Sequence, residues 1–497
     1  MKGYLGSPHY LQVLILSFSC FFLLGSFVQF VINATNNCTY YNNDYTDSKT
    51  TNNEYYIECI GDSITAICYG LVSLLTMAGL FVGLYKSSDA DLIIAFVIFG
   101  ILVSYASDAL TNLIVSCSAG DTTDQNLFDD DSYDAARKKC EIYSYSVAGG
   151  VFGMFGGFLG GYYGIKMKLN GFFYIQRPIG LFIAMSGYAM IFCFNTLATA
   201  FPTCHYYDEG KDQLPNTTPP YLPIEDDLVY DQLQPICLGY NRTAIGYGVG
   251  SFVSLMGIPV MFRYQKRGMW IIFATFLVFC SSSNYSTFEA VKLQSCNNKS
   301  NFLSGLPFFY NSYQSQQFNN SCKYFEISSY VSIIATVAAG LAVVISIVDT
   351  FILHIDHDTL IIRFRRAMFF AFGTCFSLAN GFTLMASLKP DCNLYSGNLN
   401  DDAVSADTDD VIERTNCRGK TAQFLFYMIS AAACALGLVI SLIVNFPENK
   451  VAIGLMGLDE EDSNNDMKTA DHDAVIGKQN EPLLTGYSVN DQNHDTF

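Results

Sequence analysis

Ten long apolar stretches, separated by polar connections, dominate the pattern of this sequence. They cover approximately residues 10–32, 60–85, 91–115, 143–165, 179–201, 243–262, 269–290, 328–353, 367–388 and 422–446. A membrane-spanning helix needs about 20 mostly apolar residues, because hydrocarbon offers no partner to a bare peptide group. The pattern therefore predicts an all-α, polytopic membrane protein with about ten transmembrane helices. A cleaved signal peptide is the alternative for the first stretch, but its length favours a retained helix.

The connections between these stretches alternate in character. Every second connection is short and basic, with Lys86; Lys166, Lys168 and Arg177; Arg263, Lys266 and Arg267; and Arg363, Arg365 and Arg366. The others are longer and rich in Asp, Asn and Tyr. Short basic connections stay on the cytoplasmic side of a membrane. We therefore expect both termini in the cytoplasm, the long connections on the extracellular or lumenal side, and a location in the plasma membrane or an endomembrane vesicle.

Composition agrees with a protein whose main partner is the lipid bilayer. Only 14% of the residues are charged, and the net charge is −18. Soluble domains carry about 25% charged residues. Nucleic acid is excluded as a partner, because phosphate binding needs clustered Lys and Arg.

Cysteines divide the chain into five similar helical hairpins. Each long connection holds two of them: Cys38 and Cys59, Cys117 and Cys140, Cys204 and Cys237, Cys296 and Cys322, and Cys392 and Cys417. Paired cysteines on an oxidising face predict a disulfide within each connection. The predicted organisation is a cytoplasmic segment 1–9, hairpin repeats 10–85, 86–166, 167–264, 265–356 and 357–446, and a disordered acidic cytoplasmic tail 447–497.

Glycosylation sequons lie on the same predicted side as these cysteines. They begin at Asn33, Asn37, Asn216, Asn241, Asn284, Asn298 and Asn319. All fall in or beside a long connection, which predicts a glycoprotein.

Small residues mark one helix of each hairpin, most densely in the fourth stretch. There the glycines are Gly149, Gly153, Gly157 and Gly161, with Gly156, Gly160 and Gly164 beside them. Glycines four residues apart share a helix face and let another backbone approach closely. The partner is either another helix of this chain or a second membrane protein, including a second copy in a homo-oligomer.

The other helix of each hairpin carries a polar residue near its outer end. These residues are Gln29, Asp108, Asn195, Asn284 and Asn380. A polar group inside a membrane is costly and should face protein or water. One interpretation is a ring lining a pore or a substrate site, for which Asp108 is the strongest candidate. Hydrogen bonds between helices, or a position among the lipid headgroups, are the alternatives.

No catalytic motif is present, and we expect a non-enzymatic protein without metal or cofactor. The stretch from His354 to Asp358 and the acidic residues between 401 and 410 are interpreted as charged loops rather than metal sites. In the tail, Leu483 and Leu484 follow Glu481 and Pro482 and predict a dileucine sorting signal.

The hairpin design resembles MARVEL-type tetraspan proteins of vesicle membranes. The resemblance covers residues 10–165 and rests on the opening Leu11–Leu16, the pair Cys38 and Cys59 and the glycine-rich fourth helix. It implies membrane organisation or vesicle traffic, which is our first functional hypothesis. A transporter or channel with a polar intramembrane ring is the second hypothesis, and a surface receptor or adhesion protein is the third.

Overall fold

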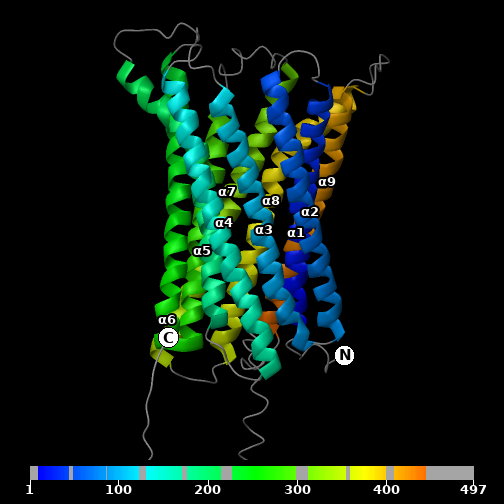
Figure 1. Ribbon diagram of the computed structural model, residues 1–497. Coiled ribbons are helices and arrows are strands. Elements are labelled where there is room, and N and C mark those ends of the chain that lie inside the picture. Colours follow the sequence, from blue (N-terminus) through cyan, green and yellow to red (C-terminus); the bar gives the residue numbers. More distant parts are fainter. Residues whose placement is uncertain are drawn as a thin grey trace, which may run out of the picture. The chain divides into compact units, whose positions relative to one another are not determined.

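The computed structural model describes residues 9–43, 49–85, 87–122, 130–170, 176–213, 226–297, 312–353, 359–398 and 408–443, all of them helical. In chain order the helices are α1 (His9–Asn43), α2 (Lys49–Tyr85), α3 (Ser87–Thr122), α4 (Asp130–Asn170), α5 (Gln176–Gln213), α6 (Asp226–Asn297), α7 (Ser312–Ile347), the π-helix η2 (Val348–Leu353), α8 (Thr359–Asn398) and α9 (Thr408–Ile443) (Figure 1).

Ten segments of these helices are long and apolar enough to cross a membrane, which confirms the predicted number of spans. Helix α6 contains two of them, α6N (Ile236–Phe262) and α6C (Gly268–Leu293). The chain reverses direction between α6N and α6C. The reversal brings Gly257 next to Ile272, so that a Cβ on Gly257 would lie 2.9 Å from the Ile272 side chain. Each of the other spans lies in one helix, except Cys322–Phe351, which runs from α7 into η2.

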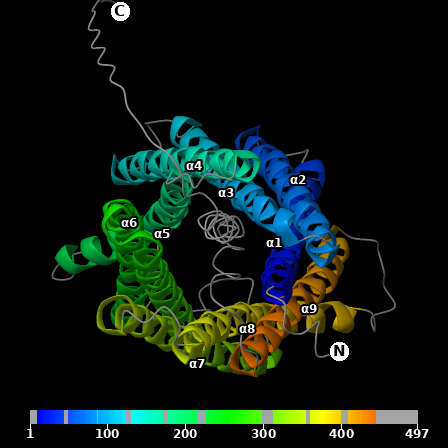
Figure 2. The same ribbon diagram turned by 90° about the horizontal axis from the view of Figure 1, so that it is seen from below.

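The helices of the unit Met1–Leu458 form a closed ring (Figure 2). Each helix packs against the next along the chain, and α9 packs against α1. Ser430 of α9 donates to the Phe18 carbonyl of α1 (3.1 Å), and the Asn36 amide of α1 donates to Asn416 of α9 (2.8 Å). These bonds join the two ends of the helical sequence, so α1 completes the ring. The second unit, Asp459–Phe497, lies outside the described residues.

Two sets of helices alternate around this ring. We call α1, α3, α5, α6C and α8 the inner helices, and α2, α4, α6N, α7 and α9 the outer helices. Each outer helix contacts the inner helices before and after it. Each also exposes a stripe of large apolar side chains, as at Leu71 (63%), Phe155 (58%), Phe252 (63%), Val337 (55%) and Leu436 (52%). Such stripes suit hydrocarbon, so the outer helices present the main lipid-facing surface.

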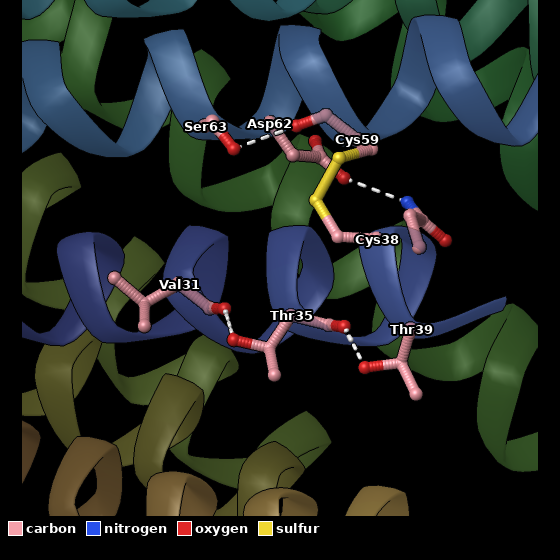
Figure 3. Close-up of a disulfide and its surroundings, with 8 residues drawn as sticks. Val31, Thr35, Cys38, Thr39, Cys59, Asp62 and Ser63 are labelled. Carbon is pink, nitrogen blue, oxygen red and sulfur yellow. Dashed lines mark hydrogen bonds between the residues drawn. A yellow bond between two sulfur atoms is a disulfide. The ribbon is translucent and has the colours of Figure 1, made fainter. Parts of the chain in front are cut away.

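Disulfides join the two helices of a hairpin at one end of the ring. The bonds Cys38–Cys59, Cys117–Cys140, Cys204–Cys237 and Cys392–Cys417 confirm four of the five predicted pairs. Figure 3 shows the first of them. Cys322 is also disulfide-bonded, but the Cys296 side chain lies outside the described residues, so that pairing stays a prediction. Six other cysteines are free thiols, namely Cys20, Cys68, Cys193, Cys280, Cys375 and Cys434.

The glycines of α4 lie against helices of the same chain. A Cβ on Gly156 would lie 2.5 Å from the Ala184 nitrogen of α5, and one on Gly149 2.7 Å from Met190. Gly153 and Gly160 face α5 as well. On the other side of α4, Gly150 and Gly157 lie against α3. Gly164 lies against Arg177 of α5, on the same side as Gly160. Gly161 is buried too. The glycine faces of α4 are therefore occupied within this chain.

Candidate functional site

Aromatic contacts between inner helices identify the side of each helix that faces the axis of the ring. Tyr105 of α3 lies 4.9 Å from Phe192 of α5, measured between ring centroids. Phe22 of α1 lies 5.6 Å from Phe376 of α8. In α6C and α8, the rings of Phe273 and Phe369 are 5.4 Å apart. The outer helices pack behind these contacts, so the contacting faces are turned toward the axis.

The five predicted intramembrane polar residues share these faces. Each polar residue lies roughly one, two or three helical turns after one of the aromatic residues just named on the same helix, as Asp108 does after Tyr105. Residues separated by whole turns share a helix face. On α3 the opposite side is the lipid-facing one, where Leu110 and Ile114 are each 45% exposed. The structure therefore places Gln29, Asp108, Asn195, Asn284 and Asn380 on the axis side, one from every inner helix.

A second set of polar residues fixes their common depth. The residue six positions after the second cysteine of each pair is polar and buried, namely Thr65, Ser146, Thr243, Ser328 and Gln423. The first four bond the next inner helix at the same level. Thr65 donates to Ser107 (3.0 Å), Ser146 to Asn195 (2.7 Å), Thr243 to the Ser283 carbonyl (3.2 Å) and Ser328 to the Ala379 carbonyl (3.0 Å). These acceptors are either an axis-facing polar residue or the residue just before one. We call the five axis-facing residues the polar ring.

Four members of the polar ring have amide hydrogen bonds within the protein. Gln29 donates to Asn33 (3.0 Å), and the Asn380 amide donates to the Phe376 carbonyl (2.8 Å). Asn195 accepts from Ser146, as described above, and Asn284 accepts from Tyr247 (2.7 Å). The interhelical bonding anticipated from the sequence is thus present at Asn195 and Asn284.

Asp108 differs from the other members of the polar ring. Its main-chain carbonyl accepts from the Asn112 amide (3.1 Å), but among the described residues no hydrogen bond or ion pair reaches its carboxylate. All five side chains are half-buried rather than buried. The polar ring therefore contains four amides and one carboxylate that has no partner in the part of the chain that the structure describes.

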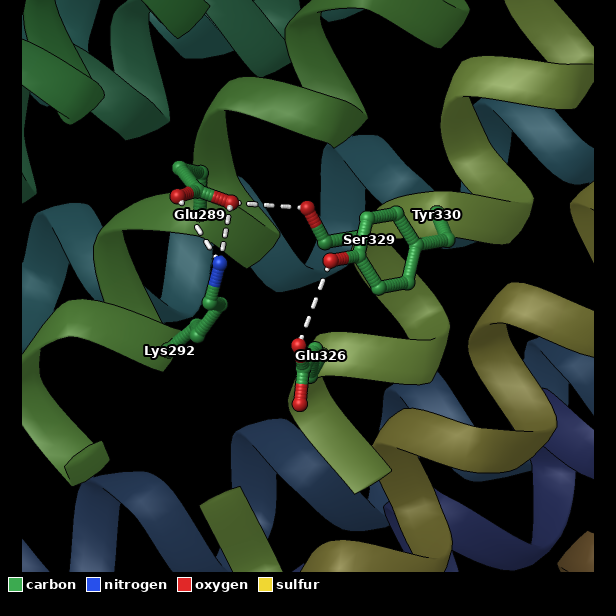
Figure 4. Close-up of polar contacts among 5 residues, drawn as sticks. All are labelled: Glu289, Lys292, Glu326, Ser329 and Tyr330. Atoms are coloured by element: carbon green, nitrogen blue, oxygen red, sulfur yellow. Dashed lines mark hydrogen bonds and ion pairs between the residues drawn. The ribbon is translucent and has the colours of Figure 1, made fainter. Parts of the chain in front are cut away.

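Six other acidic side chains lie within the spans, and three of them, Asp62, Glu289 and Asp349, bond a neighbouring helix. Asp62 accepts from the Asn37 amide (2.8 Å) beside the first disulfide (Figure 3). Glu289 accepts from Ser329 (2.7 Å) and pairs with Lys292 (3.1 Å) (Figure 4). All three bind neighbouring side chains, which indicates ties between helices rather than a site.

The third of these acids lies at the opposite end of the ring from the disulfides. Asp349 of η2 forms an ion pair with Arg365 of α8 (2.7 Å). The guanidinium of Arg365 also lies 5.0 Å from the Trp270 ring of α6C. Asp62, Glu289 and Asp349 all lie near the end of a span. The sequence alone therefore could not distinguish them from acidic residues of the connecting loops.

The structure also places several predicted modification sites. Asn33, Asn37, Asn241 and Asn284 lie within spans, and each makes a side-chain contact. Asn216, Asn298, the Asn319 side chain, Leu483, Leu484 and the charged segments 354–358 and 401–407 lie outside the described residues. Use of these sequons and of the sorting signal stays a prediction.

No family model, curated protein or solved structure matches this chain. The resemblance to MARVEL-type proteins accordingly stays a prediction. Fold and site together define the class, a multi-pass, all-helical membrane protein with disulfide-bonded hairpins.

Proposed function

We propose that this protein is a transporter or channel in which small polar solutes pass along the axis of the ring. The observation that carries the proposal is the polar ring, because each inner helix turns one polar side chain toward the axis. Polar side chains inside a membrane are costly unless they face protein or water. Their half-buried state, on the side away from lipid, supports contact with water.

The aromatic pairs next to the polar ring suit a closed gate. Tyr105 with Phe192, and Phe22 with Phe376, bring rings from different inner helices together on the axis side. Apolar constrictions gate pores by excluding water. Passage would then require these aromatic rings to separate. The disulfides, which lie on the opposite side of the polar ring from the aromatic pairs, would keep the hairpin helices together.

The first functional hypothesis, membrane organisation or vesicle traffic, has weaker support. It would use the glycine faces of α4 to bind other membrane proteins. Those faces already pack against α3 and α5 of the same chain. What remains in its favour is the topology, the tail motif and the MARVEL-type resemblance. A non-enzymatic role fits both hypotheses.

Labelling of introduced cysteines tests the axial path. The six free thiols are first replaced by Ala. Asn284→Cys is then compared with Ile114→Cys, a control on the lipid-facing side of an inner helix. We expect a charged, membrane-impermeant thiol reagent, added to protein in liposomes, to label position 284 and not position 114. Equal protection of both positions in correctly folded protein would overturn the proposal.

A further inference from the structure

One side of the axis combines a carboxylate with several aromatic rings. Tyr105 and Asp108 share a face of α3, and Tyr188 and Phe192 share the facing side of α5. The centroid of Tyr105 lies 5.4 Å from that of Tyr188 and 4.9 Å from that of Phe192. All four residues are half-buried, so part of each remains accessible.

Two buried tyrosines support these rings from the outer helices. Tyr69 of α2 contacts Tyr105 edge to face, with centroids 5.8 Å apart, and is 1% exposed. Tyr247 of α6N stacks on Phe192 at 5.2 Å and is 3% exposed. Aromatic pairs of this geometry are stabilising. Tyr105 and Phe192 are therefore backed by packed side chains of the outer helices.

The chemistry of this surface suits an organic cation. Aromatic faces attract ammonium groups through their negative π-surface, and the attraction grows when the cation is desolvated. The Asp108 carboxylate supplies the opposite charge and has no protein partner among the described residues. A divalent metal fits less well, since no cluster of three metal-ligating side chains occurs in the described part of the chain.

We propose that the axis side of α3 and α5 binds a methylated ammonium cation, with Asp108 as its counter-ion and Tyr105, Tyr188 and Phe192 as its aromatic wall. This inference rests on the proposed axial path, because the cation would reach the wall along the axis. The face formed by α1 and α8 has aromatic rings and amides but no carboxylate in the polar ring, so binding is assigned to the α3 and α5 side.

Calorimetry on the purified full chain in nanodiscs tests the site. The probes are choline and dimethylbutanol, its neutral carbon isostere. We expect choline to bind at least about tenfold more tightly, since only the cation interacts with the carboxylate and the ring faces. Equal binding of the two probes would overturn the inference.

Variants locate the binding. Asp108→Asn should weaken choline binding about tenfold, because the opposite charge is lost. Tyr188→Leu should weaken it about fivefold, in line with the strength of desolvated cation–π contacts. Glu289→Gln is the matched control, an acidic residue in a span that bonds its neighbours, and it should leave choline affinity unchanged. Unchanged affinity in both Asp108→Asn and Tyr188→Leu would reject the site, and using both protects the test against misfolding of one.

The outcome is separable from that of the proposed function. Cysteine labelling along the axis without choline binding removes this inference alone. Choline binding that depends on Asp108, without labelling at position 284, removes the transport proposal and leaves a binding site.

Discussion

The contact between α4 and α5 predicts a strong effect of a single methyl group at Gly187. A Cβ at this position would overlap the backbone of Gly153 and lie 2.7 Å from the Gly149 carbonyl oxygen. Backbone atoms cannot rotate away as a side chain can, so the two helices must move apart. Gly340 of α7 is the matched control, because a Cβ there would meet nothing within 4 Å.

The magnitude follows from comparing Gly187→Ala with Gly340→Ala. Alanine stabilises a helix interior by roughly 0.5–1 kcal/mol relative to glycine, and this gain is common to both positions. Overpacking costs about 1–3 kcal/mol and applies only at Gly187. The difference in free energy of unfolding should therefore equal the overpacking cost, about 1–3 kcal/mol.

Reversible unfolding of the purified protein in mixed detergent micelles measures this difference. We expect Gly340→Ala to match or exceed the wild-type stability and Gly187→Ala to fall below it. Equal stability of the two variants would refute the reasoning, because it would mean that α4 and α5 do not meet backbone to backbone.

Three further predictions follow from the hairpins. Cys59→Ser should lower the free energy of unfolding by about 3 kcal/mol under non-reducing conditions, and a loss that persists in reductant would argue against the disulfide as its source. Thr243→Val should cost about 0.6–1.7 kcal/mol, the range for hydrogen bonds between membrane helices, and no measurable loss would contradict the shared depth of the polar ring. Asn284→Gln should leave electrophoretic mobility unchanged, because we expect no glycan on a side chain that accepts from Tyr247 inside a span; a faster-migrating variant would disprove this.

Span number and disulfide pairing could be predicted because their signals are local. A run of apolar residues marks a span wherever it packs, and two cysteines at facing helix ends are neighbours once the hairpin forms. The partner of the α4 glycines needed the structure. Four-residue spacing predicts close packing with any backbone, and contacts such as that with Gly187 identify α5 of the same chain.

The orientation of Asp108 shows why the site itself was beyond the sequence. Asp108 and Leu110 are two residues apart and lie on opposite sides of α3, one toward the axis and one toward lipid. An inner helix must be apolar both where it packs and where it meets hydrocarbon, so its pattern does not distinguish the axis from the membrane. The distinction comes from contacts with other helices, such as that of Tyr105 with Phe192. A polar residue in such a helix becomes a functional candidate only when those contacts place it on the axis side, as they do for all five members of the polar ring.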